Sequence, residues 1–455
     1  SVRGEIDTDA GTPYEDNLID LCGFKSNRRQ GAELLHNSYF NKGSAFPNGE
    51  RNEFKLHGLL PPNVQTLDEQ VARAYQQYSS RPNSLAKNTF IASLRMQNEV
   101  LYYKVYLPAF EEMALKDALL PSSKQTHLKE MFSVIYTPTE GDAIQNYSRL
   151  FRRPEGCFLS IDNQDRIEEV FRSANRADDV DYIVVTDGEE DRSCIDFHIS
   201  FRMALTVHTD PGIGDQGVGS ILISVAKLVL TTLCAGIHPS RQLPVVLDCG
   251  TYVDYHPGHH LKEEAYVMSQ NKKLLDDKLY LGLRRPRVRG GEYDRFVDKF
   301  VETVRGNSQE RAFTCLFLIF LFNLQMECKL TAMREDFGLH NARRLLDKYR
   351  PHIPCFNDDI QGTGCVTLAA IMAALHVSRV DITEIRVVIF GSGSAGTGIA
   401  DQIADAIATE SRTIKEEAVK HIWFAFTEPT SLEEALSNSV SQVYRQTRVA
   451  PQVLS

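Results

Sequence analysis

The chain has 455 residues, of which 42% are hydrophobic and 24% charged, and its formal net charge is −10. These values are typical of a globular protein with two or three domains. The negative charge argues against a nucleic-acid partner, because such proteins carry an excess of basic side chains. The longest apolar run, Ala312 to Phe322, has 11 residues, and a membrane span needs about 20. We therefore expect no transmembrane helix and no membrane partner.

Helices and strands are predicted to alternate along most of the chain. Residues 1–40 form a polar tail, and apolar residues at helical spacing predict helices over 66–80 and 85–119. From Val134 onward, strand-type runs alternate with helices, which indicates an α/β fold. The clearest strands cover 183–186, 243–247, 385–390 and 421–426, and a helix is expected over 366–375.

The strongest local motif is a glycine-rich turn between a strand and a helix. Strand 385–390 leads directly into Gly391, Gly393 and Gly396. Glycines at this spacing allow a tight turn, close approach of a pyrophosphate and close packing of helix on strand. We interpret the motif as a dinucleotide site; the alternative is an ordinary turn in a doubly wound sheet. Glu428, after the next strand, is the candidate ribose ligand.

Two acidic pairs precede this motif, Glu335-Asp336 and Asp358-Asp359. Carboxylates that converge on one point suit a hard divalent cation such as Mg²⁺ or Mn²⁺. Acidic pairs are more often solvated surface groups. Beside a dinucleotide motif, they favour a metal-assisted dehydrogenase.

Several longer motifs are more specific, and together they resemble the malic enzyme family. They follow one another in the family's order from about residue 40 to 423: HGLLPP at 57–62, YTPTEGDA at 136–143, VVTDG at 184–188, GIGDQGVGSI at 212–221, AGIHPSRQLPVVLDCGT at 235–251, LYLGLRRPRVRGGEYDRF at 279–296, then EDFG, FNDDIQGT and GSGSAG. The order makes the resemblance more specific than any single motif. Within the family, the motifs are most similar to the fungal NAD-type branch.

The resemblance implies oxidative decarboxylation of (S)-malate to pyruvate and CO₂ with reduction of NAD or NADP. Lys227 matches the family's general base, and burial would lower the pKa of a lysine as that role requires. Asp358 matches the carboxylate that orients it, and Tyr136 the acid that protonates C3. The alternatives are a surface lysine at 227 and a buried, non-catalytic tyrosine at a strand end. The implied metal ligands for Mn²⁺ or Mg²⁺ are Glu335, Asp336 and Asp359, and the implied cofactor-binding residues are Gly391, Ser392, Gly393, Ser394, Ala395 and Gly396.

The resemblance also implies a domain order and an assembly. A substrate and metal domain, helical and then α/β, is expected over 41–360, followed by an incomplete Rossmann-like dinucleotide-binding domain over 361–455. Family members form dimers or tetramers, so a homo-oligomer is expected. Nine cysteines without a CxxC pair indicate reduced thiols, which suits the mitochondrial matrix or the cytoplasm.

The chain departs from the family pattern at three extra segments, near 190–211, 252–270 and 306–334. The first stands where the family has an arginine that clamps malate, and Arg192 lies only within the extra segment. The second holds His256, His259 and His260, for which a metal role is the lesser interpretation. Retained introns in a gene model are one hypothesis for all three, which sequencing of spliced transcripts would test.

The end of the chain is also short for the family. The 65 residues from Gly391 to Ser455 are expected to be too few for a complete dinucleotide-binding domain, since one βαβ unit takes about 30 residues or more. Here Glu428 has a second interpretation, as a degraded substrate position, and both stay open. The function is thus expected to be that of a malic enzyme. The alternatives are an impaired fragment or pseudoenzyme that keeps only assembly or ligand binding, and a related enzyme that releases lactate.

Overall fold

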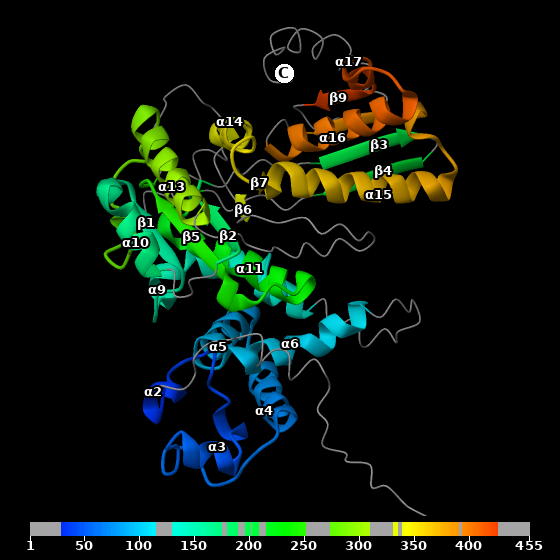
Figure 1. Ribbon diagram of the computed structural model, residues 1–455. Coiled ribbons are helices and arrows are strands. Elements are labelled where there is room, and N and C mark those ends of the chain that lie inside the picture. Colours follow the sequence, from blue (N-terminus) through cyan, green and yellow to red (C-terminus); the bar gives the residue numbers. More distant parts are fainter. Residues whose placement is uncertain are drawn as a thin grey trace, which may run out of the picture. The chain divides into compact units, whose positions relative to one another are not determined.

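The computed structural model describes residues 29–114, 130–174, 180–189, 196–201, 203–208, 215–251, 274–309, 331–334, 339–390 and 394–425. They divide into two compact units, the first made of residues up to 82 together with 90–108, the second of the remainder. The elements of each unit are coloured along the sequence in Figure 1. The predicted tail over 1–40 lies mostly outside the described residues.

Two short helices and three longer ones make up the described N-terminal part. They are α2 (Ala32–Leu35), α3 (Asn48–Glu53), α4 (Leu67–Ser79), α5 (Ser84–Gln97) and α6 (Glu99–Ala114). A capping box between Thr66 and Glu69 begins α4. The helical segment expected over 85–119 is confirmed as far as Ala114, but it consists of two helices because Asn98 interrupts it. The Asn98 side chain accepts a hydrogen bond from the Leu101 N–H at 2.9 Å and so begins α6 as a separate helix.

A five-stranded parallel sheet, in the order β1-β5-β2-β6-β7, forms the centre of the second unit. Its strands are β1 (Cys157–Ser160), β2 (Tyr182–Thr186), β5 (Gln242–Asp248), β6 (Thr331–Arg334) and β7 (Cys355–Asn357). The predicted strands at 183–186 and 243–247 are therefore confirmed. The third extra segment was expected to run to residue 334, but its last residues form β6, between β2 and β7.

Helices cover both faces of this sheet. α10 (Ile167–Ala174), α13 (Gly291–Gln309) and α14 (Leu339–Tyr349) share one hydrophobic core with alternate residues of β2 and β5, among them Ile183 and Val245. The intervening residue Val184 packs against Leu228 of α11 (Ile221–Ala235) on the other face. Burial on both faces explains why the strands read as continuous apolar runs.

Two short helices, α8 (Thr139–Gln145) and α9 (Tyr147–Leu150), precede the sheet. A strand-type run was expected to begin at Val134, but residues 130–135 are helical and Tyr136 follows at their carboxyl end. Local β-propensity is overridden there by the helix hydrogen bond from the Tyr136 N–H to the Phe132 carbonyl at 3.0 Å.

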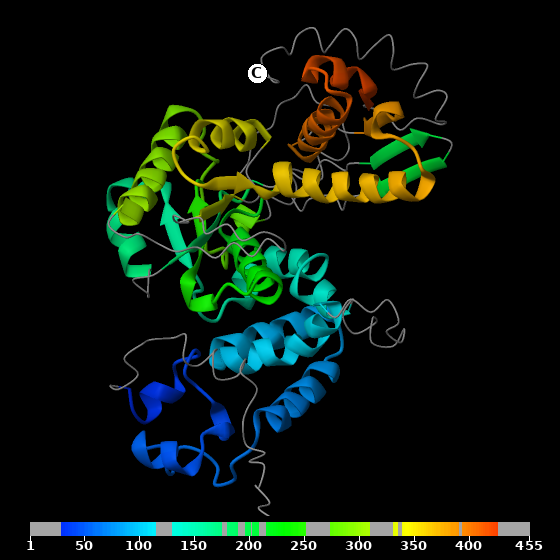
Figure 2. The same ribbon diagram turned by 45° about the vertical axis from the view of Figure 1, so that its right-hand side comes forward.

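A second sheet, in the order β4-β3-β8-β9, lies among the C-terminal helices. It contains β3 (Asp196–Phe201), β4 (Met203–His208), β8 (Arg386–Phe390) and β9 (Ile422–Ala425), with α15 (Thr363–Ser378), α16 (Ser394–Ser411) and α17 (Lys415–Ala418) around it. The strands predicted near 385–390 and 421–426 and the helix over 366–375 are confirmed. In Figures 1 and 2 the green strands β3 and β4 lie among the orange and red elements that follow them far along the chain.

Two stretches of the described chain, Gly217–Ala235 and Asp358–Ser378, are long and apolar enough to cross a membrane by length and composition alone. Neither stretch is one uninterrupted apolar run, because Lys227 and several polar residues lie within them. The first stretch contains α11, which packs against β2 and β5 and is a core helix of the second unit.

Candidate functional site

Polar residues that follow the carboxyl ends of parallel strands build the candidate site. Asp187 follows β2, Asp248 ends β5, and Asp358 follows β7. In open α/β sheets this edge is where ligands bind. The sequence motifs VVTDG and DCGT therefore end at one edge of the same sheet, as the strand register between Thr186 and Val246 requires.

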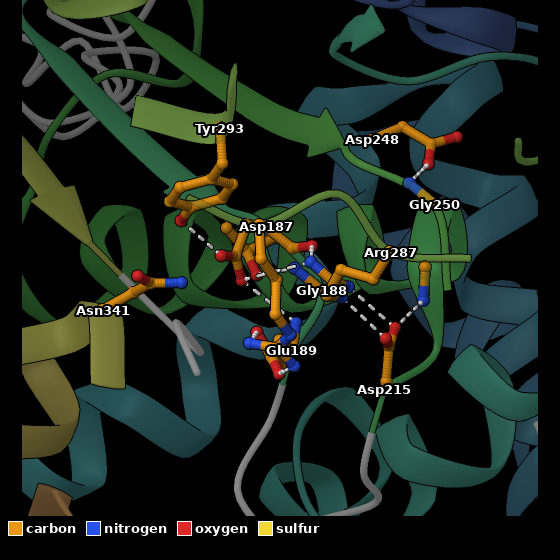
Figure 3. A network of polar contacts seen from close by, with 12 residues as sticks. Asp187, Gly188, Glu189, Asp215, Asp248, Gly250, Arg287, Tyr293 and Asn341 are labelled. Carbon is orange, nitrogen blue, oxygen red and sulfur yellow. Dashed lines mark hydrogen bonds and ion pairs between the residues drawn. The ribbon is translucent and has the colours of Figure 1, made fainter. Parts of the chain in front are cut away.

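A buried carboxylate, Asp187, forms one half of a polar network at this edge (Figure 3). Its Oδ2 accepts a hydrogen bond from the Tyr293 hydroxyl at 2.6 Å, and its Oδ1 accepts one from the Glu189 N–H at 3.1 Å. Burial raises the pKa of Asp187 to about 6, although the nearby Arg287 guanidinium lowers it. Desolvation therefore outweighs charge attraction at this carboxylate.

The other half of the network is an ion pair between Arg287 and Asp215, whose side chains are 1% and 4% exposed. The guanidinium donates twice to the carboxylate, at 2.7 and 2.8 Å, and a third time to the Asp187 carbonyl at 2.9 Å. Burial lowers the pKa of Arg287, but the Asp215 and Asp187 carboxylates more than offset it. Bidentate geometry makes this a strong pair.

This network joins the residues that precede the first extra segment to those that follow it. The Gln216 N–H donates to the Gly188 carbonyl at 3.2 Å, and Arg287 bridges Asp187 and Asp215. A Cβ at Gly188, where φ is +79°, would lie 2.7 Å from the Gly217 carbonyl oxygen. The sequence analysis assigned no role to Asp187, Asp215 and Arg287. Each of them stands in a separate motif, and nothing in the sequence shows that the three meet.

The three residues expected to be catalytic come together in the second unit. Lys227 Nζ lies 2.5 Å from Asp358 Oδ2 and 4.8 Å from the centre of the Tyr136 ring. The Lys227 side chain is 14% exposed and that of Asp358 is 29% exposed. Lys227 is thus not a surface lysine. Chemically, a lysine held by a carboxylate beside a phenol can accept and return protons.

Each of these residues is held by a different element. Lys227 is on α11, Tyr136 precedes α8, and Asp358 begins the π-helical turn Asp358–Gly362. Asn357 caps that turn, since its Oδ1 accepts from the Ile360 N–H at 2.9 Å. The turn is packed tightly, because a Cβ at Gly398 of α16 would lie 2.2 Å from the Ile360 carbonyl oxygen.

Of the three expected metal ligands, Asp359 is half-buried beside Asp358, whereas Glu335 and Asp336 lie outside the described residues. Within the described ranges, no group of three His, Cys, Asp or Glu side chains is placed to hold a metal ion. β6 and β7 are parallel neighbours with Arg334 opposite Asn357. The acidic pair at 335–336 therefore follows β6 at the sequence position where the pair at 358–359 follows β7.

The glycine-rich motif is described only in part. Gly391, Ser392 and Gly393 lie outside the described residues, while α16 begins at Ser394 and continues through Ala395 and Gly396. β8, α16 and β9 form a unit in which the two strands are parallel, as a dinucleotide motif requires. Four other candidates also lie outside the described residues: Arg192, the histidines at 256, 259 and 260, Glu428, and the apolar run from Ala312.

Comparison with known families assigns most of the chain to two domain models. The model described as malic enzyme, N-terminal domain, matches residues 116–190 and 205–316. The model described as malic enzyme, NAD binding domain, matches residues 360–438. The unmatched residues 191–204 fall within the first extra segment.

Individual relatives support the same family assignment. The chain is 43% identical over 414 residues to the mitochondrial NAD-dependent malic enzyme of Saccharomyces cerevisiae, covering 90% of this chain and 51% of that protein. It is 41% identical to the NAD-dependent malic enzyme of Schizosaccharomyces pombe, over 85% of this chain and 56% of that protein. It is 39% identical to NAD-dependent malic enzyme 3 of Bacillus subtilis, over 87% and 56%. The chain thus spans about half the length of the curated relatives it matches.

Proposed function

Because the chain belongs to the malic enzyme family, we propose that it catalyses the NAD-dependent oxidative decarboxylation of (S)-malate to pyruvate and CO₂. The observation that carries the proposal is the cluster of Lys227, Asp358 and Tyr136, in which the ammonium lies 2.5 Å from one residue and over the ring of the other. These residues come from three distant parts of the chain, so their meeting is a property of the fold.

In this proposal the three side chains divide the proton transfers among them. Lys227 accepts the proton of the C2 hydroxyl while the C2 hydride passes to NAD⁺, and Asp358 holds the amino group in position. Loss of CO₂ from the resulting β-keto acid leaves the enolate of pyruvate. Lys227 gives its proton to the enolate oxygen to form enolpyruvate, and it takes the O–H proton back as Tyr136 protonates C3 to form pyruvate. Proton transfer from Lys227 to the Tyr136 oxygen then restores both residues. Lys227 Nζ lies 4.8 Å from the Tyr136 ring centre, so the two groups that handle these protons are neighbours.

Glu335, Asp336 and Asp359 would hold the divalent metal, since their oxygen donors suit Mg²⁺ or Mn²⁺. When bound, such an ion polarises the C2 oxygen and stabilises the negative charge that develops there as CO₂ leaves. The paired register of β6 and β7 supports this set, because it brings the ends of both strands side by side. The identity of the ion, and these ligands, belong to the proposal.

Gly391, Ser392, Gly393, Ser394, Ala395 and Gly396 would bind the pyrophosphate of NAD at the start of α16. The names of the relatives, all NAD-dependent malic enzymes, support NAD rather than NADP. We further propose that the substrate-binding part covers residues 41–360 and the dinucleotide-binding part 361–455. The protein would act as a homo-oligomer, a dimer or tetramer, in the mitochondrial matrix or the cytoplasm. The name of the Saccharomyces relative, a mitochondrial enzyme, supports the mitochondrion.

One observation favours a second candidate function. Within the described residues, the second sheet has only two mutually parallel strands, β8 and β9. A chain that keeps the fold and binds ligands or assembles without turnover is therefore the alternative.

Product analysis separates these functions. The purified chain is incubated with (S)-malate, NAD⁺ and Mn²⁺, and NADH, pyruvate and lactate are quantified. Equal amounts of pyruvate and NADH support the proposal. Lactate without net NADH indicates the lactate-releasing reaction. A folded chain that forms neither product supports the non-catalytic alternative.

A further inference from the structure

The residues that flank the first extra segment contact each other directly, without any contribution from the segment itself. Its two ends are held by Arg287, which contacts both Asp187 and Asp215, and by the Gln216–Gly188 hydrogen bond at 3.2 Å. All of these groups belong to the second unit and lie at the carboxyl edge of its first sheet. The residues that flank the segment therefore lie beside the candidate site and contact each other directly.

The first extra segment contributes a β-hairpin, β3 and β4, to the second sheet. β3 and β4 pair with each other over their whole length, from Asp196–His208 to Phe201–Met203. β3 also pairs antiparallel with β8, from Asp196 opposite Phe390 to Ser200 opposite Arg386. Figure 2 shows the two green strands beside the C-terminal helices, far in sequence from the elements next to them.

β3 lies where a doubly wound sheet has a parallel strand. There, the strand that leads into the glycine-rich turn has a parallel neighbour on each side, one for each nucleotide-binding half. Here β8 leads into that turn and has β9 parallel on one side, but β3 antiparallel on the other. An unpaired β8 would present a row of free N–H and C=O groups, which readily pair with another chain.

We propose that the β3–β4 hairpin of the first extra segment is an internal strand donor: β3 occupies the edge of β8 and completes the hydrogen bonding of that strand. The occupant of this edge is the chain's own β3, and a second copy of the chain is the competitor that it excludes. Because Asp196 lies opposite Phe390, the hairpin ends beside the glycine-rich motif, where it helps fix the strand that presents Gly391. The inference does not depend on turnover of malate.

Backbone substitution in β3 tests the proposal in the full chain. Proline has no N–H and is not tolerated within a central strand. Ile199→Pro combined with Ser200→Pro removes one donor toward each neighbouring strand, since alternate residues face opposite neighbours. Amide exchange measured by mass spectrometry should then quicken on the order of tenfold or more in residues 386–390 and stay unchanged in β2 and β5. The matched control, Ile199→Thr with Ser200→Thr, keeps both donors and should exchange like the parent chain. Unchanged exchange in β8 of the proline variant would overturn the proposal.

Deletion of the segment gives a second, independent readout. Joining Glu189 directly to Asp215 should leave the first sheet folded, because the residues that flank the segment already contact each other. The exposed β8 edge should then increase the molecular mass measured by light scattering as protein concentration rises, relative to the parent chain. A deletion variant whose mass and β8 exchange both match the parent would contradict the proposal. If the deletion variant does not fold, the flanking contacts do not suffice for the first sheet, and the proline pair still decides the role of β3.

Discussion

Lys227 and Asp358 are 131 positions apart in the sequence, yet the lysine Nζ lies 2.5 Å from the aspartate Oδ2. One residue is on the helix that covers the first sheet, and the other follows the last strand of that sheet. The pair is partly buried, with exposed fractions of 14% and 29%. Partial exclusion from water strengthens the contact relative to a surface ion pair, and so it fixes the amino group near Tyr136.

Asp358→Asn is expected to lower kcat for malate oxidation by about 10²-fold or more, because the amide no longer holds the ammonium in place. The measurement is the steady-state rate of NADH formation. Asp298→Asn is the control, since Asp298 also lies 2.5 Å from a lysine, Lys348, but in an exposed pair on the outer helices. The control should stay within about twofold of the parent chain. Equal rates for the two variants would remove Asp358 from the mechanism.

Arg287→Met is expected to destabilise the fold by about 3–5 kcal/mol, because it leaves the buried Asp215 carboxylate without its partner. Urea unfolding measures the difference. Arg289→Met is the matched control two residues along the chain, since Arg289 pairs with Glu189 at a site where the arginine side chain is 41% exposed. Loss of an exposed pair should cost about 0–1 kcal/mol. A small effect at both positions would show that the buried network does not hold this edge together.

Asp187 should make the protein less stable as the pH rises. Burial raises its pKa from 3.8 to about 6 in the folded chain, so between these values the folded state keeps a proton that the unfolded state has released. The free energy of unfolding contributed by this group therefore falls as the pH rises from about 4 to about 6. Unfolding of the parent chain and of Asp187→Asn across this range gives the contribution by difference. A difference that stays constant or grows with pH would contradict the assignment.

Gly398→Ala is expected to destabilise the protein by about 1–3 kcal/mol and to slow malate oxidation. The added Cβ would lie 2.2 Å from the Ile360 carbonyl, and the turn that must yield carries Asp358. Gly306→Ala in α13 is the control, because a Cβ there meets nothing within 4 Å. That change should be neutral or stabilise by up to about 1 kcal/mol, since alanine favours a helix over glycine. Unfolding and NADH formation are measured on both, and parent-like behaviour of Gly398→Ala would refute the tight contact.

The elements that could be predicted are those whose sequence carries a strong local pattern. β2, β5 and β8 are apolar, β-branched runs, and α15 is a long apolar helix. β6 and β7 have only four and three residues, TAMR and CFN. Their strand state comes from parallel neighbours, which no local pattern reports. The hairpin in the first extra segment was missed for the same reason, because pairing with β8 joins residues far apart in sequence.

The candidate site shows a similar division. Tyr136, Lys227 and Asp358 were chosen by resemblance to a family, and nothing in their spacing predicted that they would meet. The network of Arg287, Asp187 and Asp215 was not predicted, although each residue stands in a motif that the sequence displays. A buried ion pair depends on how three loops are arranged in the folded protein, so no local pattern predicts it. A glycine-rich turn can be predicted from adjacent residues alone.

The most direct test of the catalytic cluster is substitution of Lys227 itself. Lys227→Met keeps much of the side-chain volume but removes the base, and Lys227→Arg keeps the charge but holds its proton too firmly to act as a base. If Lys227 is the base, the parent chain forms pyruvate and NADH from malate in equal amounts, and both variants fold but lose about 10²- to 10⁴-fold in rate. Pyruvate formation at the parent rate by either folded variant would contradict this role.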